Sequence, residues 1–97
     1  MTLIAILTVE YYLHGNDSLK GKRRVANSLK QKVRSAFNVS IAETGTENSM
    51  VRLRLAVVSV SNSQVHMQSR MDKCLAMMEA ACSEEITYSD LKIIAAD

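Results

Sequence analysis

Two kinds of hydrophobic periodicity follow one another along this chain, in the order strand, helix, strand, strand, helix, strand. Alternating apolar and polar residues, the period of a strand, predict strands at residues 2–12, 38–43, 51–61 and 86–95. Apolar residues three and four positions apart predict helices at residues 19–36 and 64–82. Small and polar residues at 44–49 predict the loop of a hairpin between the two middle strands.

This order of elements predicts the fold class. Crossover connections are right-handed, and the two middle strands pair as a hairpin. The chain should therefore form an α+β, ferredoxin-like β-α-β-β-α-β two-layer sandwich, in which one antiparallel sheet carries both helices on one face. With 97 residues, it should form a single domain over residues 1–97.

The composition excludes several classes of protein. No apolar run approaches the roughly 18–20 residues of a membrane-spanning helix. The apolar N-terminal segment is interrupted by Glu10 and lacks the basic start and cleavage site of a signal peptide. We therefore expect a cytoplasmic protein with no membrane partner.

Residues with catalytic or ligating chemistry are few and scattered. Cys74 and Cys82 lie eight residues apart in one predicted helix, a separation of about 12 Å, which is too long for a disulfide. We expect both to be reduced thiols. Neither His14 nor His66 lies at a metal-ligand spacing or beside a nucleophile. The sequence thus predicts no cofactor, no metal site and no enzyme active site.

Positive charge is concentrated in the first predicted helix. Residues 18–42 contain seven basic residues and no acid, whereas the rest of the chain carries five basic and ten acidic residues. Five of these cations cover about 120° of the helix beside its apolar stripe: Lys20, Arg23, Arg24, Lys30 and Arg34. We call these five residues the basic strip. Such a strip suits a phosphate backbone, although it could also be a solvated helix face.

One lysine of the same helix falls on the apolar stripe instead. Lys22 lies near the centre of that stripe, in the first turn of the helix. Long lysine stems can cross apolar surface and keep the ammonium group in water. We therefore expect Lys22 to extend past the edge of the sheet into solvent.

The sheet face turned away from the helices is predicted to be unusually apolar. If Leu3 and Leu7 face the helices, the opposite face carries an apolar group formed by Ile4, Ile6, Ala56 and Val58. Contiguous exposed apolar patches usually mark interaction sites. We expect this face to bind a second copy or another protein. Base stacking is the less favoured alternative, because the third strand has no aromatic residue.

Three separated segments resemble the YlxP-like family of small bacterial proteins of unknown function. They are Ser-Leu-Lys-Gly-Lys-Arg-Arg at 18–24, Phe-Asn-Val-Ser-Ile-Ala-Glu at 37–43 and Val-Ser-Val-Ser-Asn at 58–62. The resemblance implies a ferredoxin-like fold. Family genes often neighbour genes for translation initiation and ribosome maturation factors, which suggests RNA or the ribosome as a partner. The hairpin between Gly45 and Met50 departs from the family pattern, whereas Glu43 and Arg52 keep it, and we expect these two to pair.

Two functions remain open from the sequence. The first is a non-enzymatic module that associates with RNA or the ribosome through the basic strip. It would read little sequence, because nothing here offers contacts to base edges. The alternative is a homo-oligomeric or protein-binding scaffold that uses the apolar sheet face.

Overall fold

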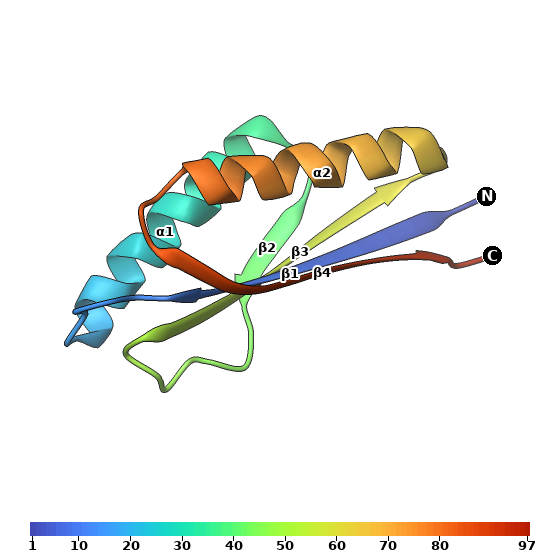
Figure 1. Cartoon of the computed structure of the whole chain (residues 1–97). Coiled ribbons are helices and arrows are strands. Elements are labelled where there is room, and N and C mark those ends of the chain that lie inside the picture. Colours follow the sequence, from blue (N-terminus) through green and yellow to red (C-terminus); the bar gives the residue numbers. More distant parts are fainter.

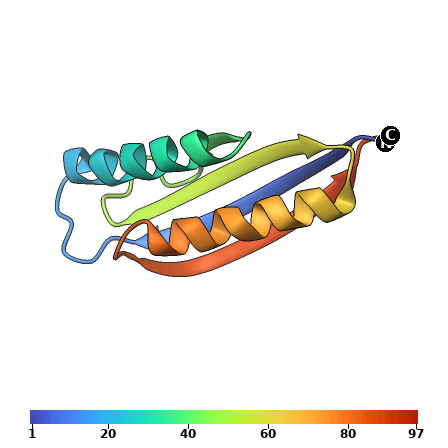
Figure 2. The same ribbon diagram turned by 90° about the horizontal axis from the view of Figure 1, so that it is seen from above.

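The computed structural model, which describes residues 1–97, confirms the predicted fold class (Figure 1). The elements follow the order β1 (Leu3–Tyr12), α1 (Leu19–Ala36), β2 (Ser40–Glu43), β3 (Arg52–Ser61), α2 (Gln64–Ala80) and β4 (Glu85–Ala95). The four strands form one antiparallel sheet in the order β2-β3-β1-β4. Both helices cover the same face of this sheet (Figures 1 and 2).

The helices begin where serine side chains cap them. The hydroxyl of Ser18 accepts a hydrogen bond from the amide of Gly21, and that of Ser63 accepts one from the amide of His66. Each bond satisfies an amide that has no partner within its own helix. Local hydrogen bonding therefore fixes both starts, and it is readable from the sequence.

Two element boundaries differ from the predicted ones by two residues, and the starts of β1, β3 and β4 differ by one. β2 begins at Ser40 rather than at residue 38, and the carbonyl of Asn38, before the strand, accepts from the Ser59 hydroxyl at 3.1 Å. α2 ends at Ala80 rather than at 82, where the chain turns toward β4. Differences of one or two residues are common at the ends of elements, which fray.

The core lies between the helices and one face of the sheet. It is formed by alternate residues of β1 and β3 and by the apolar stripes of both helices; its largest fully buried members include Leu7, Tyr11, Leu29, Leu53, Leu55, Met67, Met71 and Met78. Three of the methionines of α2 are thus packing residues, as their spacing indicates.

Two buried polar groups belong to this core. The Tyr11 hydroxyl donates to the carbonyl of Met78 at 3.0 Å, which ties β1 to the end of α2. Burial raises the pKa of Tyr11. Burial also raises the pKa of the Cys74 thiol to about 11, so this residue behaves as a small apolar group. Cys74 and Cys82 are both free.

The chain termini lie side by side at one end of the sheet (Figures 1 and 2). The Thr2 amide donates to the Asp97 carboxylate at 2.6 Å, and the Ala96 amide donates to the carbonyl of Thr2 at 2.8 Å. Neither helix has the length and apolar character that crossing a bilayer requires.

Candidate functional site

The basic strip runs along α1 on the side of the β2 edge. Lys20, Arg23 and Arg24 are exposed, and no ion pair in the structure involves them. Lys30 is half-buried, and Arg34 donates to the carbonyl of Ile41 in β2 at 3.1 Å. The strip therefore contains free guanidinium and ammonium groups in the first turns of α1 and an anchored arginine near its end.

Lys22 does not behave as its sequence position predicts. The expectation that its ammonium group reaches solvent is wrong, because the residue is only 3% exposed. Its Nζ lies 2.6 Å from Glu43 Oε2 and donates to the carbonyls of Ser49, at 2.6 Å, and Thr46. Three acceptors satisfy the three protons of the ammonium group. Lys22 therefore fastens the start of α1 to the β2–β3 loop and is unavailable to a ligand.

The expected pairing of Glu43 with Arg52 is also wrong. Glu43 faces Leu55 across the β2–β3 ladder and so lies on the helix side of the sheet. Arg52 lies on the other side, where its Nε donates to Glu10 Oε2 at 2.9 Å. Because side chains alternate between the faces of a sheet, the two glutamates Glu10 and Glu43 are separated by the sheet itself.

Glu10 and two arginines form a network on the open face. Arg52 donates to both carboxylate oxygens of Glu10, and Arg54 Nε lies 3.1 Å from Oε1. Hydrogen bonding from Arg52 is the main cause that lowers the pKa of Glu10, and Arg54 adds to it against the opposing effect of burial. The same pairing raises the pKa of Arg52. These arginines are held by a carboxylate, in contrast to the free cations of the basic strip.

A polar pocket of about 300 Å³ lies beside the basic strip, between α1 and the β2–β3 loop. Arg23 and Lys30 line it from the helix, and Glu43 and Glu47 line it from the loop region. Lys22 pairs with Glu43, whereas exposed Glu47 has no ion-pair partner. The helix that lacks acids in sequence thus has carboxylates beside it in space, which the sequence could not reveal.

The open sheet face has an apolar end and a polar end. The predicted apolar group lies together: Ile4 faces Val60, Ile6 faces Val58, and Ala56 faces Thr8. Val60 and Ile94, 59% and 50% exposed, extend it. The sequence reading missed Ile94 as part of this group, because the irregular alternation of β4 does not show which residues share a face.

Aromatic residues gather at the polar end, and the sequence reading also missed this. Tyr88 is 50% exposed and lies 6.0 Å from the Arg54 guanidinium. The rings of Tyr12 and His14 meet edge-on, with centroids 4.5 Å apart, and His14 Nε2 lies 2.7 Å from Glu85. Tyr88 comes from β4 rather than β3, so its position beside Arg54 depends on sheet order.

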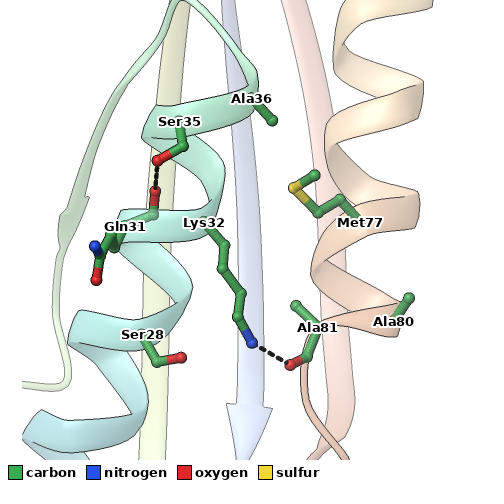
Figure 3. Close-up of a pocket in the computed structure, with 8 residues that line it drawn as sticks. All are labelled: Ser28, Gln31, Lys32, Ser35, Ala36, Met77, Ala80 and Ala81. Carbon is green, nitrogen blue, oxygen red and sulfur yellow. Dashed lines mark hydrogen bonds between the residues drawn. The ribbon is translucent and has the colours of Figure 1, made fainter.

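A groove of about 890 Å³ separates the two helices (Figure 3). Small side chains line it, and Lys32 spans it by donating to the carbonyl of Ala81 at 3.1 Å. Ser35 donates to the carbonyl of Gln31 in its own helix. No acid or nucleophile–base pair lines this groove, and its one cation, Lys32, bonds to a backbone carbonyl, so the basic strip remains the stronger candidate site.

The fold and the position of this strip define a ferredoxin-like α+β sandwich with a cationic first helix, and comparison with known proteins adds its family. The chain belongs to the family of proteins of unknown function DUF503, whose model matches residues 4–91. It is 30% identical over 78 residues to the uncharacterized protein YlxP of Bacillus subtilis (strain 168), covering 80% of this chain and 85% of that protein. The resemblance seen in the sequence is therefore confirmed.

Solved structures support the fold alone. The de novo designed protein Foldit4 matches over the whole of both chains with a TM-score of 0.61 and 8% identity. A structural genomics protein, YJCS, matches 97% of this chain and 99% of its own with a TM-score of 0.50 and 8% identity. At such identity, shared architecture carries no information on function.

Proposed function

We propose that this protein is a non-enzymatic, cytoplasmic module that associates with RNA or the ribosome through the basic strip of α1. The observation that supports this proposal is the set of exposed cations Lys20, Arg23 and Arg24, which no carboxylate of the chain pairs. Cations left free on one face can exchange condensed counterions of a phosphate backbone. The paired arginines of the open face have a carboxylate partner already.

The arrangement favours recognition of the backbone rather than of base sequence. The free groups of the strip are lysine and arginine termini rather than amides placed at base edges. Contacts of this kind position a nucleic acid without reading it. Binding should therefore be similar for RNAs of different sequence and should weaken steeply as salt rises.

The test is fluorescence anisotropy with labelled single-stranded and duplex RNA over a salt series starting near 50 mM. Three to five phosphate contacts correspond to a log–log slope of about −2 to −4. The double variant Lys20→Glu/Arg24→Glu should lose most of this affinity. Both residues are exposed and make no hydrogen bond in the structure, unlike Arg34, whose reversal would also remove its bond to β2.

A matched control carries the same change in charge elsewhere. Lys73→Glu, Gln64→Glu and Ser69→Glu together place that change on exposed positions of α2. This control should keep a clearly larger share of the affinity. Equal loss of affinity in both variants would show that net charge, and not the basic strip, determines binding, and would contradict the proposal. Absence of wild-type binding near 50 mM salt would also contradict it.

A second candidate function is a scaffold that binds a protein, or a second copy, through the apolar end of the open face. The exposure of Val60 and Ile94 beside Ile4 favours it. Val58→Glu should then dissociate the complex and leave a folded monomer, since an unpaired buried charge costs several kcal/mol. Val65→Glu on α2, where Val65 is 75% exposed, is the matched control. A wild-type protein that stays monomeric and captures no protein at high concentration would contradict this second candidate.

A further inference from the structure

The outer edge of β4 is the longest unpaired edge in the molecule. β4 spans 11 residues and pairs only with β1, and no element lies beyond it (Figure 2). Its outward amides and carbonyls are free to continue the sheet. At the opposite edge, β2 spans only four residues. Natural proteins usually shorten, charge or cover such edges, because a long edge is a template for strand pairing.

The only charges within the central part of this edge are Asp90 and Lys92. Both point to the open face, since they lie opposite Thr8 and Ile6 of β1. Neither has an ion-pair partner in the chain. A lone lysine on an edge strand discourages pairing. Here an aspartate lies two positions away on the same face, so the lysine could pair with the aspartate of a second strand.

We propose that β4 pairs antiparallel with β4 of a second copy about a twofold axis at Leu91, joining two sheets into one. In this register, Asp90 faces Lys92 of the second copy, and Lys92 faces its Asp90. Directly opposite charges stabilise an antiparallel pair. A symmetric axis makes every such contact occur twice, so one complementary pair in the sequence produces two in the dimer.

The neighbouring registers are disfavoured by the same two residues. An axis at residue 90 places Asp90 opposite its own copy, and an axis at residue 92 does the same for Lys92. Like charges directly opposite one another destabilise strand pairs. The charges therefore select the axis at Leu91 and act against slippage.

The apolar residues of β4 agree with this register. Tyr88 and Ile94, each 50% exposed, would face one another across the axis on the open face. Aromatic and β-branched residues form favourable cross-strand pairs. On the helix side, half-buried Leu91 would meet its own copy, and half-buried Ile93 would lie beside it. Residues that the single chain leaves partly exposed would thus be covered.

The helices leave room for this pairing. The backbone of α2 approaches β1 and β3 more closely than it approaches β4. In the joined sheet, the two β1 strands would be three strand spacings apart, about 14 Å, whereas packed helices need only 8–10 Å. The basic strips lie on the β2 side of each copy and would remain exposed at the two ends of the sheet.

Charge exchange tests this proposal. The molar mass of the wild type, followed by light scattering from about 1 μM to about 1 mM, should rise toward twice the 10.8 kDa of one chain. Asp90→Lys and Lys92→Asp should each weaken dimerisation by about ten- to a hundredfold, because two attractive contacts become repulsive. Combining both substitutions should restore the wild-type affinity, because the pair is re-formed with its charges exchanged.

Controls separate the edge from the apolar sheet face. Val58 lies two strands from β4, so Val58→Glu should leave dimerisation by the edge unchanged. Circular dichroism should show both single variants folded, since neither residue loses an ion pair within the chain. A wild type that is monomeric at 1 mM, single variants that dimerise as well as wild type, or a double variant that fails to recover would each overturn the proposal. Failure of RNA binding would leave it standing.

Discussion

The two edges of the sheet differ in how completely the chain itself occupies them. At the β2 edge, α1 and the β2–β3 loop are fastened by Lys22, by the bond from Arg34 to Ile41, and by Asn16, whose side-chain amide donates to the carbonyl of Met50 at 2.5 Å. At the other edge, β4 pairs only with β1, and no strand lies beyond it. One edge is closed by the chain, and the other is left for a partner.

The difference between the edges keeps two surfaces apart: the cations of α1 at the β2 edge and the unpaired backbone of β4. At the β2 edge, Lys22 is bound to Glu43 and to the β2–β3 loop, whereas Lys20, Arg23 and Arg24 of α1 stay exposed and unpaired. The unpaired edge of β4 is at the opposite edge of the sheet from those cations. Two partners, a phosphate backbone and a second copy, could therefore bind together without competing.

The largest expected effect tests the closed edge. Lys22→Met should lower the free energy of unfolding by about 3 kcal/mol, because the half-buried Glu43 carboxylate loses its cation and keeps only the Thr46 hydroxyl, and two loop carbonyls lose their lysine donor. Urea denaturation measures the change. Lys20→Met, an exposed lysine of the same helix, should change stability by within about 0.5 kcal/mol. Equal effects of the two substitutions would show that the buried contacts of Lys22 with Glu43 and the loop do not stabilise the fold.

The next effect concerns Gly21 in the first turn of α1. Alanine is normally better in a helix by about 1 kcal/mol, but a Cβ here would collide with the side chain of Asn16. Gly21→Ala should therefore destabilise the protein by about 1–2 kcal/mol, since Asn16 must release the carbonyls of Ser18 and Met50.

The control for Gly21 is a double-mutant cycle. With Asn16→Ala already present, Gly21→Ala should become neutral or stabilising, because the collision is gone. Thermal or urea unfolding of the four proteins measures this coupling. Additive effects would show that the close approach of Asn16 does not require a glycine.

The smallest effect lies between the edges, on the open face. Glu10→Gln should cost below about 1 kcal/mol at pH 7, because the side chains of Arg52 and Arg54 are 52% and 41% exposed and stay hydrated without the carboxylate. The pKa of Glu10 is lowered in the folded protein. Its contribution is therefore complete above the ordinary pKa near 4.5 and is lost as the pH falls through the lowered value.

The measurement is unfolding free energy against pH for wild type and Glu10→Gln. The difference between them should be constant from pH 6 to 8 and should shrink below about pH 4. A difference that grows on acidification would contradict the assigned pairing.

The fold was predictable because its signals are local and repeated. Alternation in β1 and β3 and the stripes of both helices give the element order, and Ser18 and Ser63 mark the helix starts. The basic strip was predictable for the same reason, since one helix defines its geometry. Lys22 was not, because its partners Glu43, Thr46 and Ser49 lie in another segment. The position of Tyr88 and Ile94 likewise depends on how β4 joins the sheet.

The central claim is that α1 binds RNA at one edge of the sheet and β4 pairs with a second copy at the other. It is tested most directly by amide chemical shifts of the uniformly 15N-labelled protein in two titrations. Adding RNA near 50 mM salt should shift residues of α1 and the β2–β3 loop, and raising salt should reverse this. Raising protein concentration without RNA should shift residues 88–94 of β4 and leave α1 unchanged. RNA-dependent shifts centred on β4 or on the open face, or concentration-dependent shifts centred on α1, would contradict this account.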